Sequence, residues 1–108
     1  MEVKEFCELH GLTDSHVNDG KLIDRDLFIN DMVTFIPEGA KLYVKGNLYI
    51  DNVTTLKNVA IYATGSVYST KLLCIEDSVL EAEWLVAPIL KYIKNSTIKG
   101  QFFIDKRF

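Results

Sequence analysis

The sequence predicts an all-β protein, a short single-stranded β-solenoid (β-helix) of four to five coils with an N-terminal helical cap. Three observations predict this fold. Apolar residues alternate in strand patterns of only three or four residues, as in Leu42, Val44, Leu48 and Ile50. Turn-forming residues recur between these strand patterns. Equivalent apolar residues return at a nearly constant spacing, which is typical of a stacked repeat architecture.

The repeat shortens slightly along the chain. Three apolar series can be written, and in each of them every step is one position shorter than the step before it. The series are Leu48, Val67, Leu85, Phe102; Val33, Val53, Leu72, Leu90; and Ile36, Leu56, Ile75, Ile93. A single coil cannot bury such residues or pair its own backbone, whereas coils stacked about 4.8 Å apart do both. We therefore expect coils at 21–40, 41–59, 60–78 and 79–96, and a partial coil at 97–108.

Before the repeat, the sequence predicts a short amphipathic helix. Val3, Phe6, Cys7 and His10 recur at helical spacing, with acidic residues mostly opposite them and a glycine after them as a suitable helix end. A helix this short needs tertiary support. We therefore expect residues 1–12 to form a capping helix that docks on the first coil.

Residues 13–20 are polar and rich in turn formers, which predicts a linker between the capping helix and the solenoid. The solenoid would then span 21–108, and the whole chain, 1–108, has the length of one domain. An antiparallel sandwich or barrel is the alternative fold. Locally, residues 78–94 also have the composition of a helix. Trp84 falls in this irregular coil, either in the core, which we favour, or as an interface anchor.

The predicted corners of the coils contain residues that accept tight or left-handed backbone conformations. They are Asp26, Gly46, Asn47, Asn52, Asn58, Gly65, Ser66, Asn95 and Gly100. Their recurrence between strand patterns is what a coil that bends several times per turn requires.

One stretch resembles a known repeat. Residues 36–50, IPEGAKLYVKGNLYI, are similar to a repeat written L-P-E-G-L-x-V-x-G-x-L-x-L in bacterial and bacteriophage solenoid proteins. Within it, residues 46–50, GNLYI, resemble the G-x-L-x-I steps of bactofilins, which are polymer-forming β-helix proteins. The resemblance covers about one coil and implies no catalytic residues. By analogy it implies a small accessory protein acting inside a bacterial host, or a scaffold.

Composition argues against some classes of function. The net charge is −3 and no basic run interrupts the aromatic residues, so we do not expect nucleic-acid binding. No apolar run approaches the roughly 20 residues that span a bilayer, and the first residues lack the apolar core of a secretory signal. We therefore expect a cytoplasmic protein that does not bind membranes. In that compartment Cys7 and Cys74 are expected to be free, buried thiols.

The most informative feature is a set of large side chains that should face outward. If Leu48 and Ile50 point into the core, the residue between them points out. Stacking then gives two outward columns, Phe28, Tyr49, Tyr68, Val86, Phe103 and Leu22, Tyr43, Tyr62. Taken together as one outward aromatic face, they indicate an interface. The alternatives are that a terminal segment covers this face, or that the tyrosines simply stack across strands.

A second candidate is the acidic edge of the first coil, formed by Asp24, Asp26 and Asp31. Asp24 and Asp26 would lie on one side of a strand, and paired carboxylates can perform acid–base chemistry on carbohydrates. No nucleophile, phosphate-loop or metal-ligand motif accompanies them. We therefore expect a solvated edge, with no metal site, no cofactor and no enzymatic activity.

These features together predict a non-enzymatic protein–protein interaction module. We expect a small phage or bacterial accessory or inhibitor protein that binds a host macromolecule through the outward aromatic face. Homodimerisation through the same face is its simplest form. Two alternatives remain: a structural scaffold that polymerises through its coil ends, and a carbohydrate-active enzyme that uses the acidic first coil.

Overall fold

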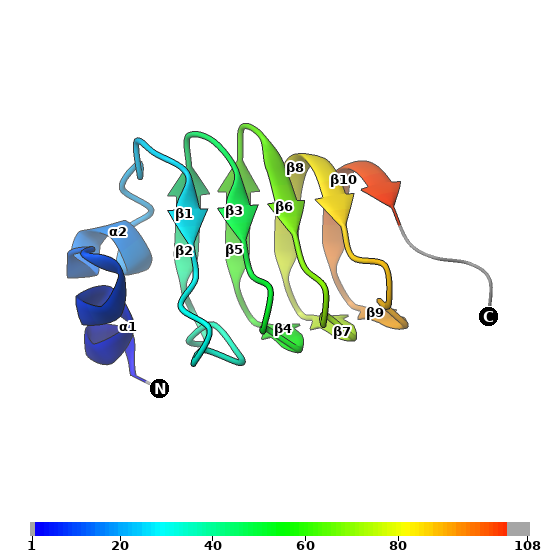
Figure 1. Cartoon of the computed structure of the whole chain (residues 1–108), viewed down its shortest axis with the longest axis horizontal. Helices are drawn as coiled ribbons and strands as arrows, with labels where there is room; N and C mark the ends of the chain where they lie inside the picture. Colours follow the sequence, from blue (N-terminus) through cyan, green and yellow to red (C-terminus); the bar gives the residue numbers. More distant parts are fainter. Residues whose placement is uncertain (1, 104–108) are drawn as a thin grey trace.

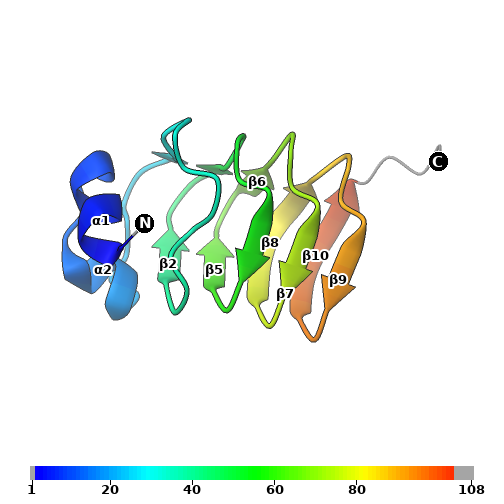
Figure 2. The ribbon, with the colours of Figure 1, turned by 90° about the horizontal axis from the view of Figure 1, so that it is seen from below.

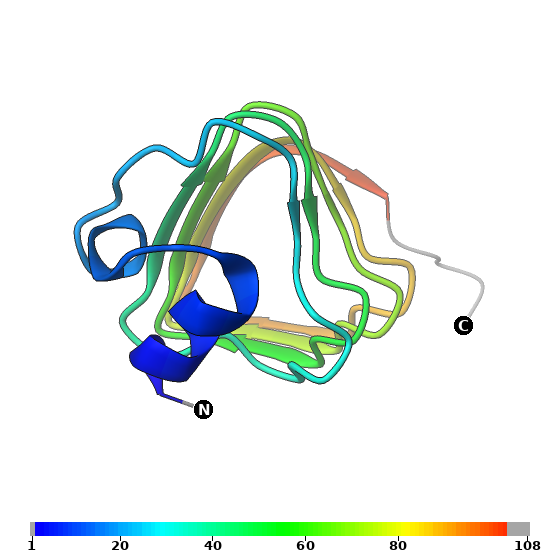
Figure 3. The same ribbon diagram turned by 60° about the vertical axis from the view of Figure 1, so that its left-hand side comes forward.

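The computed structural model describes residues 2–103. Over this range the chain forms a β-solenoid of about four turns, in which all paired strands run parallel. Figure 1 shows the coils side by side along the long axis, with two helices at the N-terminal end. The coils wind in a right-handed sense (Figures 1 and 3). The predicted solenoid with a helical cap is confirmed, and the antiparallel alternative is wrong.

Each coil is roughly triangular when viewed close to the axis, so the solenoid has three faces (Figure 3). Figure 2 shows the same stack of coils from below. The first face contains β2 (Lys41–Val44), β5 (Ala60–Ala63) and the beginnings of β8 (Val79–Val86) and β10 (Thr97–Phe103). The second face contains the ends of β8 and β10 together with β1 (Leu27–Phe28), β3 (Leu48–Tyr49) and β6 (Ser66–Tyr68). The third face contains β4 (Thr55–Lys57), β7 (Cys74–Glu76) and β9 (Tyr92–Lys94).

The core consists of inward residues that stack on equivalent residues of the next coil. Strand register pairs Leu48 with Val67, Val67 with Leu85, and Leu85 with Phe102, as the first predicted series requires. The first three of these side chains are at most 1% exposed. Burying one aliphatic side chain stabilises a fold by about 1.5–3 kcal/mol. Such columns therefore hold the stack together.

From the third coil onward, the coils shorten at the corner between the first and second faces. Tyr62 pairs with Glu81 before this corner, and Ser66 pairs with Trp84 after it. The separation from Ser66 to Trp84 is one position shorter than that from Tyr62 to Glu81, yet β8 crosses the corner as a continuous strand. A helix over residues 78–94 is therefore not formed. The same loss moves the Trp84 side chain to the surface, so the favoured prediction of a core tryptophan is wrong.

A second residue is lost at the same corner one coil later. The step from Glu81 on β8 to Lys99 on β10 is one position longer than the step from Trp84 to Gln101. Between Lys99 and Gln101, Gly100 has a φ of 126°, and a Cβ atom there would collide with the carbonyl oxygen of Ala82. A glycine permits both the backbone conformation and the close approach.

Side chains of the predicted corner residues connect neighbouring coils. A carboxylate oxygen of Asp26 accepts the N–H of Asn47 at 2.8 Å, and Asn47 Oδ1 accepts the N–H of Ser66 at 2.8 Å. At the corner between the third and first faces, every coil has a residue with left-handed backbone. These residues are Gly39, Asn58, Asp77 and Asn95. The corners are therefore specified by small polar residues and glycine, as predicted.

Two helices, α1 (Val3–His10) and α2 (Asp14–Asn18), cover the open end of the first coil (Figure 3). Phe6, Cys7 and Val17 are buried beneath them. Burial of these apolar side chains explains why elements as short as these remain helical. The predicted capping helix is thus present, and it has a second helix beside it.

The prediction of a linker at residues 13–20 is wrong, because α2 lies within it. The N–H of Thr13 donates to the ring Nδ1 of His16 at 2.9 Å, which ties the residue before the helix to its first turn. Val17, on the inner side of α2, is completely buried. Local capping and one buried anchor together outweigh the turn-forming composition of the segment.

His10 joins the cap to the first coil. Its ring Nδ1 lies 2.6 Å from the carbonyl oxygen of Phe6, so Nδ1 carries the proton and donates it. The opposite nitrogen, Nε2, accepts the N–H of Asn30 at 2.9 Å. The His10 carbonyl oxygen also accepts a bond from the Arg25 guanidinium at 2.8 Å. Burial lowers the pKa of His10, with the Phe6 carbonyl opposing this effect and Arg25 adding to it.

Candidate functional site

One outward column runs through all the coils of the second face. We call Phe28, Tyr49, Tyr68, Val86 and Phe103 the second-face ladder, because strand register places each beside the next. The rings of Phe28 and Tyr49 stack with centroids 4.4 Å apart and 3° between their planes. Those of Tyr49 and Tyr68 stack at 5.1 Å and 11°. These distances are close to the coil spacing of about 4.8 Å, so each ring stacks on its equivalent in the next coil.

Stacking determines which parts of the rings remain free. The flat sides of Tyr49 face its two neighbours, and its hydroxyl accepts a bond from the Asn47 side-chain amide at 3.4 Å. Tyr49 and Tyr68 are only partly exposed. The first and last rungs are more open, with Phe28 65% exposed and Phe103 55% exposed. The surface offered by the second-face ladder is thus a strip of ring edges with an open aromatic ring at each end.

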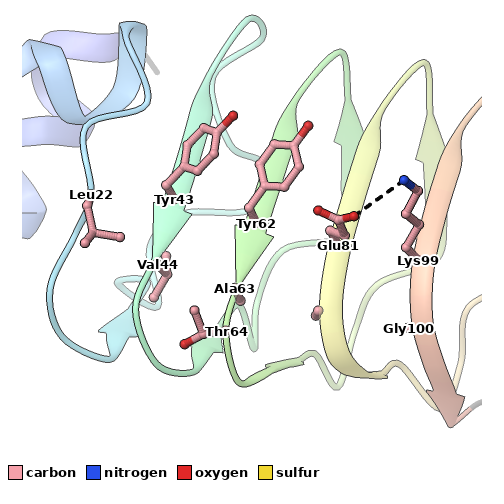
Figure 4. A pocket seen from close by; sticks show the side chains of 10 residues that line it. Leu22, Tyr43, Val44, Tyr62, Ala63, Thr64, Glu81, Lys99 and Gly100 are labelled. Carbon is pink, nitrogen blue, oxygen red and sulfur yellow. Dashed lines mark ion pairs between the residues drawn. The ribbon is translucent and has the colours of Figure 1, made fainter.

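The other predicted column lies on the first face. Tyr43 stacks on Tyr62 with ring centroids 4.5 Å apart and 16° between planes. The next two positions along this row are Glu81 and Lys99, whose charged atoms lie 3.6 Å apart. Figure 4 shows this row beside a shallow groove with a volume of about 370 Å³, and Leu22 lines the same groove. The aromatic character of this column therefore ends after two tyrosines.

The N-terminal segment contacts this first-face column. A Cβ atom added to Gly20, just after α2, would lie 2.6 Å from the ring of Tyr43. The side of the ring that does not face Tyr62 is therefore packed against the backbone. Burial raises the pKa of Tyr62, and Tyr43 and Glu81 raise it further. One alternative from the sequence, coverage by a terminal segment, thus applies in part to this column.

The prediction of one continuous outward aromatic face is wrong. Tyr43 and Tyr62 lie on the first face, whereas the second-face ladder lies beyond the corner that contains Gly46 and Gly65 (Figure 3). Alternation along a strand distinguishes inward from outward residues, but it does not show how far the chain bends between two strands. The interface candidate is therefore confined to the second-face ladder.

The predicted acidic edge does not form paired carboxylates on a strand. Asp24 and Asp26 lie outside the strands, on either side of a bend at Arg25. The Asp24 carboxylate pairs with Lys45 at 3.6 Å, whereas that of Asp26 accepts a backbone N–H. Asp31 is exposed in a turn, where its carbonyl oxygen accepts a bond from an asparagine. These residues connect the first coil to the second and do not converge on a common point.

Other titratable residues also have structural partners. Among residues 2–103, no three His, Cys, Asp or Glu side chains gather as metal ligands would. Both cysteines are free thiols: Cys7 is buried, and Cys74 is only partly buried. Burial raises the pKa of Cys7, and the neighbouring Asp14 raises it further, both of which disfavour the reactive thiolate.

Sequence reasoning missed the exposed apolar residues of the last coil. Ile93 and Phe102 belong to inward series, yet they are 46% and 43% exposed. Tyr92 on the third face is also exposed. The exposure of Ile93 and Phe102 could have been predicted from their positions, because an inward residue of a terminal coil lacks the neighbour that covers its equivalent in a middle coil.

Comparisons with known proteins do not assign the chain to a family. No protein-family model, no curated protein and no solved structure matches it. In the part of the chain that the structure describes, no helix has the length and apolarity needed to cross a bilayer.

Proposed function

We propose that this protein is a non-enzymatic interaction module that binds a protein partner through the second-face ladder. The observation that carries the proposal is the aromatic and apolar column that continues in register through the coils, from Phe28 to Phe103. Tyrosine and phenylalanine are enriched in the cores of protein interfaces. In its concrete form, the protein is a bacteriophage or bacterial accessory protein that inhibits or modulates a host macromolecule in the cytoplasm.

The size of the ladder supports an interface centre. Its five rungs span four coil spacings, or roughly 19 Å. A standard interface buries about 800 Å² on each partner, and a few aromatic residues near its centre provide most of the binding energy. The second-face ladder fits this central role, with the surrounding polar residues of the second face as the rim.

Two features favour a protein over a nucleic acid as the partner. The flat sides of the stacked rings face one another, so few are free to receive bases. The positions two residues before and two residues after each of the first four members of the ladder also contain no lysine or arginine that could bind phosphates. These positions are Asp26, Asn47, Ser66 and Trp84 on one side, and Asn30, Asp51, Thr70 and Pro88 on the other.

A second copy of the chain is the simplest partner, because the ladders of two copies can pack about a two-fold axis. Light scattering over a concentration series would then give a dimer mass for the wild type. The double variant Tyr49→Lys, Tyr68→Lys should be monomeric, because it places charge at the centre of the interface. The matched control Tyr43→Lys, Tyr62→Lys makes the same change on the first face and should remain dimeric.

If the wild type is monomeric, the same variants test a different partner. The tagged wild type and both variants would be used to capture proteins from a host-cell lysate. We expect one protein to be retained by the wild type and by the first-face control, and lost with the ladder variant. Equal retention by all three proteins, with no dimer in solution, would contradict the proposal.

End-to-end assembly into a scaffold is a second candidate, favoured by the exposure of Ile93 and Phe102 at the last coil. Such assembly is opposed at the N-terminal end of the solenoid, because α1 and α2 cover the first coil there. Electron microscopy at high protein concentration distinguishes the two proposals, because filaments require end contacts and a discrete complex does not.

A further inference from the structure

The last coil leaves inward side chains uncovered. Ile75 on β7 is fully buried, whereas Ile93, its register partner on β9, is 46% exposed. In the same way, Leu85 on β8 is 1% exposed and its partner Phe102 on β10 is 43% exposed. Within residues 2–103, no further coil lies beyond β9 and β10. The apolar interior of the solenoid therefore reaches the surface at this end.

The backbone at this end is also available for pairing. In the described part of the chain, β10 pairs with β8 and β9 pairs with β7, so one side of each strand has no strand partner. β10 contains seven residues and forms a long edge. An unpaired edge of this kind is a template for another strand, and addition of an extended peptide to such an edge is a common recognition mode.

Charge indicates which kind of strand fits. Residues 87–103 contain three lysines and no carboxylate, whereas residues 2–40 contain nine carboxylates and three basic residues. Two of these lysines, Lys94 and Lys99, lie next to a carboxylate on the neighbouring strand of the preceding coil. Lys99 pairs with Glu81 at 3.6 Å, and Lys94 is in register with Glu76. A strand added outside the last coil would complete the same pattern if it also carried carboxylates at these positions.

The same charges disfavour a second copy at this edge. Two copies facing each other about a two-fold axis at this edge would bring together six lysines of residues 87–103, a segment that contributes no carboxylate. Edge lysines are a known device against pairing of like edges. The occupant that satisfies backbone, apolar surface and charge together is therefore an acidic strand from a different protein.

We propose that β10 and β9 form a docking edge for an extended segment of a partner protein, in which apolar residues alternate with Asp or Glu. The segment would add as a parallel strand beside β10. Its apolar residues would cover Phe102 and Ile98, and its carboxylates would face Lys99. This edge is separate from the second-face ladder, and it does not depend on the function proposed for the ladder.

The sequence of β8, VLEAEWLV, provides a rational probe because β10 already pairs with this sequence in parallel. A labelled synthetic peptide of this sequence would be titrated with the full chain and followed by fluorescence anisotropy. The control peptide VLKAKWLV has the same apolar residues and the opposite charge. We expect the acidic peptide to bind at least about fivefold more tightly than the basic one, with a difference that shrinks as salt is added.

Two charge-reversal variants locate the site on the protein. Lys99 lies on β10 and faces the proposed strand, whereas Lys57 lies on β4 of the third face, away from that edge. Lys99→Glu should weaken binding of the acidic peptide about fivefold, whereas Lys57→Glu, with the same change in net charge, should leave it unchanged. The double variant Tyr49→Lys, Tyr68→Lys should also bind the peptide normally, because it alters only the ladder.

Three results of the peptide experiments would overturn the proposal. They are equal binding of the acidic and basic peptides to the wild type, equal effects of the two lysine variants, and absence of binding by the full chain. The peptide comparison uses only the unmodified protein, so a variant that fails to fold does not affect it. A wild-type dimer that is lost in Phe102→Ser and kept in the ladder variant would show that a second copy occupies the edge, and would also overturn it.

Discussion

The same substitution at neighbouring positions of one column should have very different costs. Ile75→Ala removes a fully buried side chain, whereas Ile93→Ala removes one that is 46% exposed in the next coil. Truncating a buried isoleucine to alanine costs about 2–5 kcal/mol, which combines lost apolar transfer with the cavity left behind. We expect about 3.5 kcal/mol for Ile75. For Ile93, about half of the transfer contribution and no enclosed cavity leave roughly 1 kcal/mol.

Urea denaturation followed by circular dichroism measures this difference. With a slope of about 1.5 kcal/mol per molar, typical of a small domain, Ile75→Ala should lower the midpoint by about 2 M. Ile93→Ala should lower it by less than about 1 M on the same basis. Equal losses would refute the reasoning, because they would mean that Ile93 is covered in solution as completely as Ile75. That result would also remove the exposed apolar surface on which the docking edge depends.

Three further predictions follow from residues with unusual surroundings. The folded-state pKa of His10 lies below its unfolded value of about 6.5, so the unfolded chain binds more protons. The free energy of unfolding should therefore decrease as the pH falls below about 6.5 and through the folded pKa. Chemical denaturation at several pH values measures this decrease, which should be smaller in His10→Gln. Cys74 should react with a thiol reagent in the folded protein, whereas Cys7 should react only when urea unfolds it. Gly100→Ala should lower the free energy of unfolding by about 2–4 kcal/mol, because the residue has a positive φ and a Cβ atom would collide with a carbonyl oxygen. Gly11→Ala, with a φ of 64° and no atom within 4 Å of the added Cβ, should lower it by about 1 kcal/mol. Thermal unfolding of the two variants measures the difference.

The stacking register could be predicted from the sequence because the interior imposes it. Leu48, Val67 and Leu85 are neighbours in the fold because only a coil spacing that matches their separations places all three inside. The loss of one residue per coil was also visible in the spacings. Its position was not, because any corner could have absorbed the loss, and only the strand register shows that the corner between the first and second faces did so in the later coils.

The candidate site could be predicted only in part. Alternation within a strand correctly placed Tyr49 and Tyr68 in one outward column. It could not show that Tyr43 lies on another face, because the direction of an outward residue depends on the bend at Gly46. The helix at residues 14–18 was missed for a related reason: its support comes from burial of Val17, which is a tertiary contact.

The gradual shortening of the coils also bears on how copies of this chain could meet end to end. The step between coils from Leu27 to Leu48 is four positions longer than the step from Leu85 to Phe102. The short last coil thus differs in circumference from the long first coil of another copy. A regular filament of this chain would therefore have to bridge two coils of unequal length at every junction.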